Sequence, residues 1–121
     1  MILMGIDIVE ISRVNRLLHL YGDKFLLRML SPGEMGQVKK KKFPVNWLAG
    51  RWAAKEAAFK ALGIGSYKDF EVINENPSGK PELKFFERAG RKIAELGINF
   101  SQVSISHCKD LAIAVVILRK D

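Results

Sequence analysis

The order of apolar and polar residues in the first half of the chain predicts one strand followed by helices. Residues 2–9 are apolar apart from Gly5 and Asp7, as is typical of a buried strand. Over residues 11–21, apolar side chains recur at the spacing of an amphipathic helix. The segment Ser31-Pro32-Gly33-Glu34 places a capping serine, a proline and a glutamate where they begin a helix.

The second half begins with a long alanine-rich helix and then changes to strand periodicity. The helix follows Pro44 and ends at Gly63, a residue type common at helix C-termini. Two short strands, a helix and a hairpin are expected next, at Phe70–Ile73, Leu83–Phe86, Glu87–Leu96, and Gln102–His107 with Leu111–Leu118. The last strand is almost entirely apolar, which predicts a place in the centre of a sheet or at an interface. Early helices and late strands predict an α+β fold, with a mainly antiparallel sheet packed against the long central helix.

Composition narrows the class of protein. The chain has 121 residues, 48% of them apolar, which fits one globular domain over residues 1–121. No apolar run reaches the roughly 18 residues of a membrane span, and no basic segment precedes the first strand as in a signal peptide. The lone Cys108 excludes an internal disulfide and fits a reducing compartment, so we expect a cytoplasmic protein. With only two histidines, His19 and His107, a structural zinc site is not expected.

The charge of the chain points to an anionic partner. Twenty basic and 13 acidic residues give a net charge of +7, which suits nucleic acid, a phosphorylated small molecule or an acidic protein. The charge does not choose among these three. The run of lysines at residues 39–42 is either a solvated face or a partner contact.

Two acidic residues, Asp7 and Glu56, stand where the pattern calls for apolar ones. Burying an unpaired carboxylate costs several kcal/mol, on the order of the whole stability of a small domain. Asp7 would share a strand face with apolar neighbours. The alternative is that it caps the following helix, but it lies several residues too early for that.

Glu56 allows two interpretations. On the helical wheel it falls between Trp52 and Lys60. Glu56 and Lys60 either form a surface ion pair at i, i+4, or Glu56 holds a cation while Lys60 holds an anionic substrate beside it. Two carboxylates from separate elements, with lysine and arginine nearby, suit Mg²⁺ bridging to phosphate oxygens.

Two other features have an ordinary structural interpretation beside a functional one. His107 ends a strand and is either a hydrogen-bonded edge residue or a catalytic group. Gly63-Ile64-Gly65 resembles a phosphate loop, but it follows a helix C-terminus, whose dipole repels anions. We therefore interpret it as a cap and turn.

Four segments in order resemble one family over essentially the whole chain. They are Gly5-Ile6-Asp7-Ile8-Val9-Glu10-Ile11, the helix from Gly50 to Gly63 with its Lys55-Glu56 pair, Ser78-Gly79-Lys80-Pro81, and Val103–His107 followed by Lys109-Asp110. Together they closely resemble the small bacterial holo-acyl-carrier-protein synthase branch of the 4'-phosphopantetheinyl transferases. The resemblance implies the fold of that family.

The resemblance also implies an activity. In this family, a serine of an apo acyl carrier protein attacks the pantetheine-side phosphorus of coenzyme A, which gives the holo carrier and adenosine 3',5'-bisphosphate for fatty acid biosynthesis. Asp7 and Glu56 match the family's magnesium ligands, and with Lys60 they match its catalytic residues. The general base stays open between Glu56 and a metal-bound water.

Further positions follow from the same match. Arg51, Lys60, Gly63, Lys80 and His107 match positions near the coenzyme. The family's first helix and the segment after it bind the acidic carrier, and this region holds Arg13, Arg16 and Arg28. The family forms homotrimers with active sites between subunits, and its partners include neither nucleic acid nor membrane.

The sequence departs from the family at two places, and two rival interpretations remain. The segment from Gly63 to Tyr67 is short, and Leu111 and Cys108 stand where an aromatic and a small hydroxyl residue are usual. One rival, a basic nucleic-acid-binding module, explains neither acid, and its lysine run lacks interleaved aromatics. The other is a catalytically silent relative that only binds coenzyme A.

Overall fold

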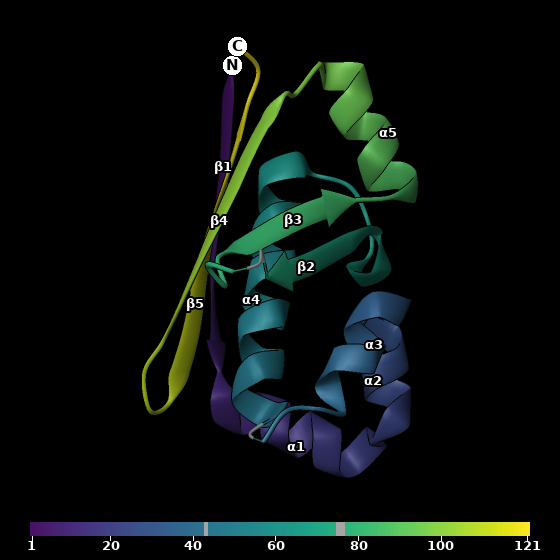
Figure 1. Ribbon diagram of the computed structural model, residues 1–121, viewed down its shortest axis with the longest axis vertical. Helices are drawn as coiled ribbons and strands as arrows, with labels where there is room; N and C mark the ends of the chain where they lie inside the picture. The colour runs from purple at the N-terminus through teal and green to yellow at the C-terminus, as the bar shows by residue number, and fades with distance from the viewer. Residues whose placement is uncertain (43, 75–76) are drawn as a thin grey trace.

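A computed structural model describes residues 1–42, 44–74 and 77–121 (Figure 1). In chain order the elements are β1 (Ile2–Glu10), α1 (Ile11–Tyr21), α2 (Asp23–Met29), α3 (Pro32–Val38), α4 (Pro44–Leu62), the 3₁₀ turn η1 (Tyr67–Asp69), β2 (Phe70–Asn74), β3 (Pro81–Phe85), α5 (Glu87–Leu96), β4 (Phe100–His107) and β5 (Leu111–Arg119). The helices and strands that the sequence predicts all lie within a few residues of their expected positions. The α+β class is therefore confirmed.

The strands form two antiparallel sheets. One has the order β1-β5-β4, and the other is the pair β2-β3. The apolar strand β5 is the central one, as predicted, and Asp7 on β1 and Ile105 on β4 both face Ala114 across it. The division into two sheets was not predicted, because an apolar pattern indicates which residues are buried but not which strands pair.

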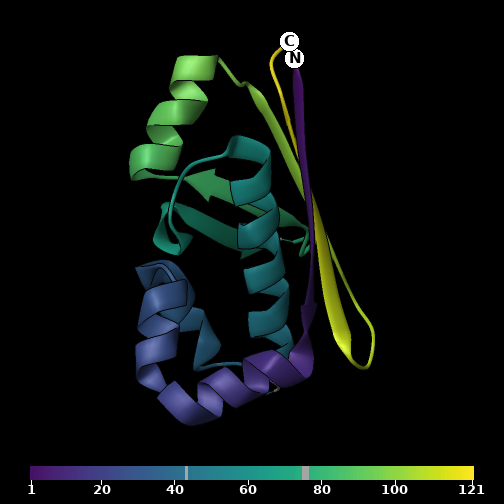
Figure 2. The same ribbon diagram turned by 180° about the vertical axis from the view of Figure 1, so that it is seen from behind.

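Helix α4 occupies the middle of the molecule. In Figures 1 and 2 it lies between the three-stranded sheet and a second layer formed by α2, α3 and the β2-β3 pair. Its alanines allow this, because they let neighbours approach from nearly every side; Ala49, Ala53, Ala54, Ala57 and Ala58 are fully buried. No helix in the described ranges is both long and apolar enough to cross a membrane.

Gly5 sets the distance between α4 and β1. A Cβ at this position would lie 1.9 Å from the carbonyl oxygen of Ala57, so only glycine permits the contact. Asp7 lies two residues after Gly5, and Glu56 immediately precedes Ala57. The close approach therefore brings the two acidic segments to one seam of the fold.

Among the described residues, the most deeply buried charged side chains are those of Lys55 and Glu34. They form an ion pair that the sequence did not reveal. Their side chains are 0% and 1% exposed, and Lys55 Nζ lies 2.5 Å from Glu34 Oε1. Nζ also donates to the carbonyl oxygens of Met29 (2.8 Å) and Tyr67 (3.1 Å). Burial lowers the pKa of Lys55, and Glu34 opposes that shift. The pair joins α3, α4 and η1 inside the core.

Glu34 keeps its predicted role at the start of α3 as well. Ser31 and Glu34 form the expected capping box, and the backbone N–H of Val72 donates to Glu34 Oε2 (2.8 Å). Both oxygens of this buried carboxylate are thus hydrogen-bonded, which offsets much of its desolvation cost.

Candidate active site

Asp7 and Lys60 meet across the seam between β1 and α4. Lys60 Nζ donates to Asp7 Oδ1 (2.8 Å) and to the carbonyl oxygen of Ile6 (3.1 Å). The Asp7 side chain is 16% exposed and that of Lys60 54%, so the pair opens to solvent. The hydrogen bond that Lys60 donates to Asp7, followed by the charge of Asp7, raises the pKa of Lys60, which keeps the ammonium charged at neutral pH.

This geometry bears on two of the structural interpretations given above. Asp7 does not cap α1, because the N-cap is Glu10 and its side chain makes no capping bond. The ion pair recorded for Lys60 is with Asp7 and not with Glu56. Asp7 and Glu56 are also only partly buried, unlike Glu34, so water and ligands can reach them.

Glu56 is held by two neutral donors on one of its oxygens. Trp52 Nε1 lies 3.1 Å from Glu56 Oε1, and the Tyr67 hydroxyl lies 2.5 Å from the same atom. Burial, followed by this hydrogen bond, raises the pKa of Tyr67, so the hydroxyl stays protonated and donates. The i, i+4 spacing of Trp52 and Glu56 was a usable signal in the sequence, but nothing there pointed to Tyr67.

The carboxylate oxygens of Asp7 and Glu56 are of the kind that binds Mg²⁺. In the described part of the chain, no three His, Cys, Asp or Glu side chains cluster closely enough to hold an ion by themselves. Mg²⁺ does not require such a cluster, since it commonly takes one or two carboxylates, with water and substrate phosphate as its other ligands. Asp7 and Glu56 would supply those carboxylates.

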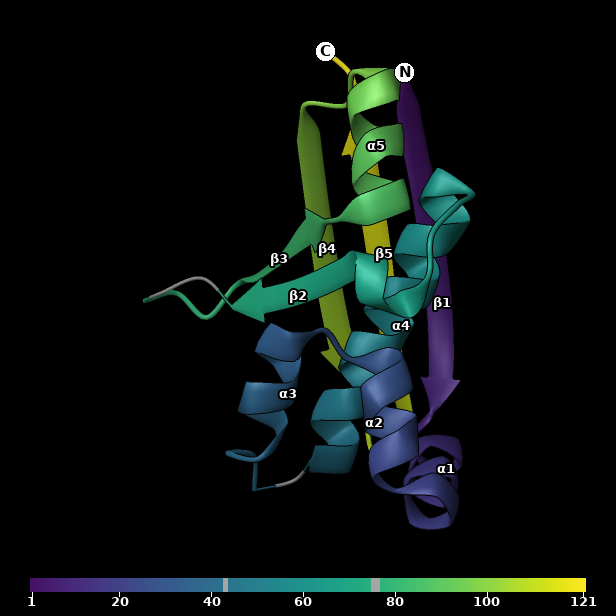
Figure 3. The same ribbon diagram turned by 90° about the vertical axis from the view of Figure 1, so that its right-hand side faces the viewer.

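The expected coenzyme residues Arg51, Lys80 and His107 lie away from the acidic pair. At about 100° per residue, Arg51 points roughly 140° from Glu56 and 180° from Lys60 around α4. His107 lies on the same side as Gly50, where an added Cβ would come within 2.7 Å of its Nε2. Figure 3 shows β1 and β4 on opposite flanks of β5. His107 ends β4, and Lys80 lines a cavity with residues 100–102 of the same strand. One chain therefore presents two separate groups of site residues.

Arg51 is the most constrained member of the second group. It is 6% exposed, stacks on Trp47 with its Cζ 4.5 Å from the ring centroid, and donates through Nη2 to Asn74 Oδ1. Asn74 in turn donates to the carbonyl oxygen of Gly79 (2.7 Å), next to Lys80. Burial lowers the pKa of Arg51 to about 10, so the guanidinium is charged at neutral pH.

Two buried N–H donors, one on Arg51 and one on the Trp47 ring that it stacks on, have no hydrogen-bond partner among the described residues. They are Arg51 Nε and Trp47 Nε1. Buried donors are rarely left unpaired in proteins. Together with the exposed ring of His107, which lies 3.1 Å from the carbonyl oxygen of Asn46, they suit recognition of anionic oxygen atoms.

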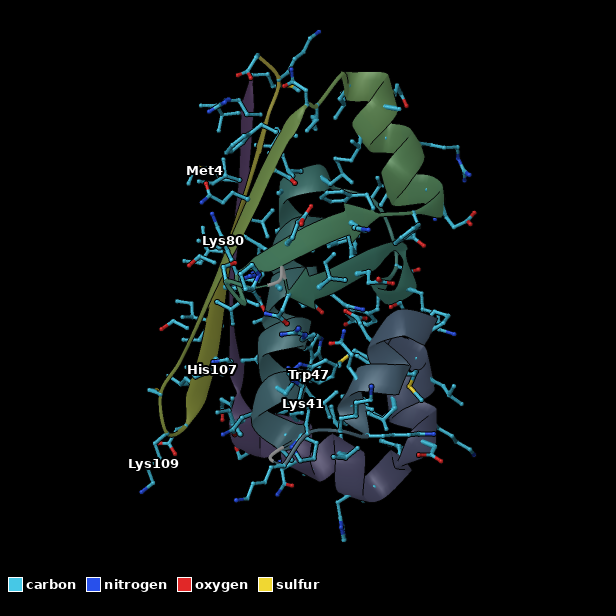
Figure 4. The ribbon with its side chains drawn as sticks, in the orientation of Figure 1. Met4, Lys41, Trp47, Lys80, His107 and Lys109 are labelled. Atoms are coloured by element: carbon cyan, nitrogen blue, oxygen red, sulfur yellow. The ribbon has the colours of Figure 1, made fainter. Side chains whose placement is uncertain are left out.

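The remaining predicted positions lie as follows. Gly63 turns the chain after α4 at φ +81°, which confirms the interpretation as cap and turn. The lysines at 39–42 are exposed, and Lys41 Nζ lies 5.9 Å from the Trp47 ring centroid (Figure 4). His107 is an edge residue with a hydrogen-bonded ring.

Arg13, Arg16 and Arg28 form an exposed basic surface on α1 and α2. The guanidinium of Arg13 stacks on Trp52, with its Cζ 5.0 Å from the ring centroid. Arg28 lines a cavity of about 340 Å³ that Glu56 and Tyr67 also line. The basic surface thus adjoins the Glu56 side of the site.

Known proteins match this chain over most of its length. A family model described as the 4'-phosphopantetheinyl transferase superfamily matches residues 3–116. The chain is 39% identical to a holo-[acyl-carrier-protein] synthase of Maridesulfovibrio salexigens, over 97% of each chain. It superposes on the crystal structure of the Neisseria meningitidis synthase with a TM-score of 0.91, 34% identity and 98% of each chain covered. The Helicobacter pylori synthase, solved in complex with coenzyme A, gives 0.82 and 36%, over 96% of this chain and 99% of that one.

Proposed function

Because this chain belongs to the 4'-phosphopantetheinyl transferase superfamily, we propose that it is a holo-[acyl-carrier-protein] synthase. It transfers the 4'-phosphopantetheine group from coenzyme A to a serine of an apo acyl carrier protein, and so supports fatty acid biosynthesis. The observation that carries the proposal is the seam at Gly5, where Asp7, Lys60 and Glu56 gather. We assign the activity to one domain, residues 1–121, acting in the cytoplasm.

In the proposed reaction the serine oxygen bonds to the phosphorus on the pantetheine side of the pyrophosphate. The bond from that phosphorus to the bridging oxygen breaks, adenosine 3',5'-bisphosphate leaves with the bonding electrons, and the serine proton passes to Glu56 or to a water molecule. Asp7 and Glu56 would hold Mg²⁺, which when bound neutralises pyrophosphate charge. Lys60, exposed and positively charged beside Asp7, steadies the charge on the transferred phosphate.

Coenzyme A would lie across the second group of residues. The charge of Arg51 and the unpaired donors Arg51 Nε and Trp47 Nε1 suit its phosphates. Lys80 and His107 are exposed on the same flank and can contact the phosphates without rearranging the core. Gly63 follows the C-terminal end of α4. We therefore assign its contact with the coenzyme to the group of site residues that contains Glu56.

We propose that the two groups of residues come together between subunits of a homotrimer. Within one chain they lie on opposite flanks of α4, so a single site needs one group from each of two neighbours. The outer face of β1 supports assembly, because it exposes Ile2, Met4, Ile6 and Ile8 at 58–62% (Figure 4 shows Met4). A contiguous apolar face of this kind is typical of an interface.

Mixing two inactive variants tests the shared site. Co-expression of Asp7→Ala with Arg51→Ala subunits should restore about a third of the activity in mixed trimers, since every ring that holds both variants has one of its three sites with both groups intact. The measurement is transfer by mixed trimers separated on two affinity tags. The matched control is Asp7→Ala with Glu56→Ala, which damages the same group twice and should stay inactive. A mixture as inactive as its separate components would contradict the shared site.

The basic surface on α1 and α2 is proposed to bind the acyl carrier protein. Such carriers are acidic, and complementary charge speeds encounter with a basic face. The exposed apolar residues Leu20 and Leu27, at 63% and 54%, offer contacts beside Arg16 and Arg28. The cavity shared by Arg28 and Glu56 provides a path from this surface to the metal site.

Transfer itself is tested by incubating the protein with coenzyme A, Mg²⁺ and an apo carrier, and then weighing the carrier. We expect the carrier to gain the mass of one phosphopantetheine group, and no gain without Mg²⁺. An unmodified carrier, while a known synthase modifies the same preparation, would refute the proposal. Binding to nucleic acid that weakens steeply with salt and needs no Mg²⁺ would favour the rival basic module instead.

A further inference from the structure

Glu56 differs from the other acidic residue of the site in how it is held. Asp7 has a cationic partner in Lys60, whereas no ion pair to Glu56 is found in the described part of the chain. Its recorded hydrogen bonds come from two neutral donors, Trp52 Nε1 and the Tyr67 hydroxyl, and both end on Oε1. Neutral donors therefore hold Glu56 without a countercharge, and one of its oxygens is fixed.

The two donors also contact each other. Trp52 Nε1 lies 3.2 Å from the Tyr67 hydroxyl, and their rings pack edge to face with centroids 6.4 Å apart. Trp52 is 7% exposed and packs against Phe25 on its other side, at 5.7 Å between centroids. The donors that hold Glu56 are thus themselves held by packing.

The backbone of Tyr67 is fixed from the core. The buried ammonium of Lys55 is held in one place, because it donates simultaneously to Glu34 and to the carbonyl oxygens of Met29 and Tyr67. Ser66 and Asp69 close η1 with a capping box. Lys55 and Glu56 are sequence neighbours on α4. Lys55 holds the backbone carbonyl of Tyr67, and Glu56 accepts a hydrogen bond from the Tyr67 hydroxyl.

We propose that Tyr67, together with Trp52, is a positioning residue for Glu56, which fixes Oε1 and leaves Oε2 directed to the metal ion. No protein donor to Oε2 is found among the described residues, so that oxygen is free to bind a cation. Partners that orient a metal-binding side chain commonly change metal affinity by about 10- to 100-fold when removed. The inference rests on the proposed Mg²⁺ site and assigns to it a residue outside the motifs read in the sequence.

Tyr67→Phe tests the inference, because it removes the hydroxyl and keeps the ring packing. The probe is Mn²⁺, titrated into protein saturated with coenzyme A and followed by the paramagnetic resonance of the free ion. We expect the Kd for Mn²⁺ to rise roughly tenfold. The Mg²⁺ concentration for half-maximal transfer should rise in parallel, while kcat at saturating Mg²⁺ is largely retained.

Two comparisons separate positioning from stability. Tyr21→Phe makes the same chemical change on the exposed face of α1, where Tyr21 is 57% exposed, and should leave Mn²⁺ affinity unchanged. A Tyr67→Phe protein with a lower Tm but wild-type Mn²⁺ affinity would show a purely structural role and overturn the inference. If the wild type bound no Mn²⁺ at all, the metal site and the inference would both fall, whereas phosphopantetheine transfer would still be judged by the mass of the carrier.

Discussion

Asp7→Asn reduces transfer by at least about a hundredfold, an effect comparable to removing one group that stabilises developing charge in a transition state. Asparagine keeps the shape of the side chain but lacks its charge, so it binds Mg²⁺ weakly and leaves pyrophosphate charge less neutralised. It also replaces the charged acceptor that holds Lys60 Nζ at 2.8 Å by a neutral amide oxygen, which holds the ammonium less firmly. The weaker Mg²⁺ ligand and the less firmly oriented Lys60 both reduce the stabilisation of charge on the transferred phosphate.

The fold of Asp7→Asn should survive, which makes the result interpretable. The Lys60 partner is 54% exposed, and an ion pair so open to solvent contributes little to stability. The measurement is the initial rate of phosphopantetheine transfer by carrier mass, together with Tm. Glu95→Gln is the matched control, because it replaces an exposed carboxylate on α5 by an amide and should leave transfer unchanged. Wild-type turnover by Asp7→Asn would remove Asp7 from the metal site.

The elements of the fold could be predicted because each has a strong local pattern. The capping box at Ser31 and Glu34, the glycine after α4 and the apolar strand β5 all lie where their chemistry indicated. Asp7 and Glu56 could be singled out for the same reason, since an acid interrupts an apolar pattern visibly. Their common location at Gly5 could not, because it depends on the packing of α4 against β1.

The residues that the sequence did not reveal act through contacts between distant segments. Glu34 was interpreted only as a capping residue and Lys55 only as part of a motif, yet they form the most deeply buried ion pair among the described residues. Tyr67 belongs to a segment that looked like a loop, and its hydroxyl reaches Glu56 11 residues away. The angular separation of Arg51 from Glu56 follows from helix geometry. That the two residues belong to separate groups of site residues could be seen only from the packing on both flanks of α4.

Lys55→Met is expected to give the largest loss of stability, because it leaves Glu34 charged and buried without its cation. Breaking one side of a buried pair costs about 3–5 kcal/mol, a large part of the 5–15 kcal/mol that holds a typical domain folded. For a chain of this size, that corresponds to a fall in Tm of roughly 10–20 °C. Lys92→Met, which removes an exposed pair with Glu95 on α5, should change stability by less than about 1 kcal/mol.

A double-mutant cycle distinguishes the ion pair from the loss of lysine packing. Glu34→Gln keeps one of the two oxygens that accept from the Ser31 and Val72 N–H groups, and it removes the charge that Lys55→Met leaves unpaired in the core. The double variant should therefore be less destabilised than the sum of the single ones, by about 0.5–3 kcal/mol in denaturant unfolding. Additive effects would mean that Lys55 stabilises the core through its bonds to Met29 and Tyr67 and not through Glu34. In that case its contribution would lie in holding η1 against α4, the contact on which the position of Tyr67 depends.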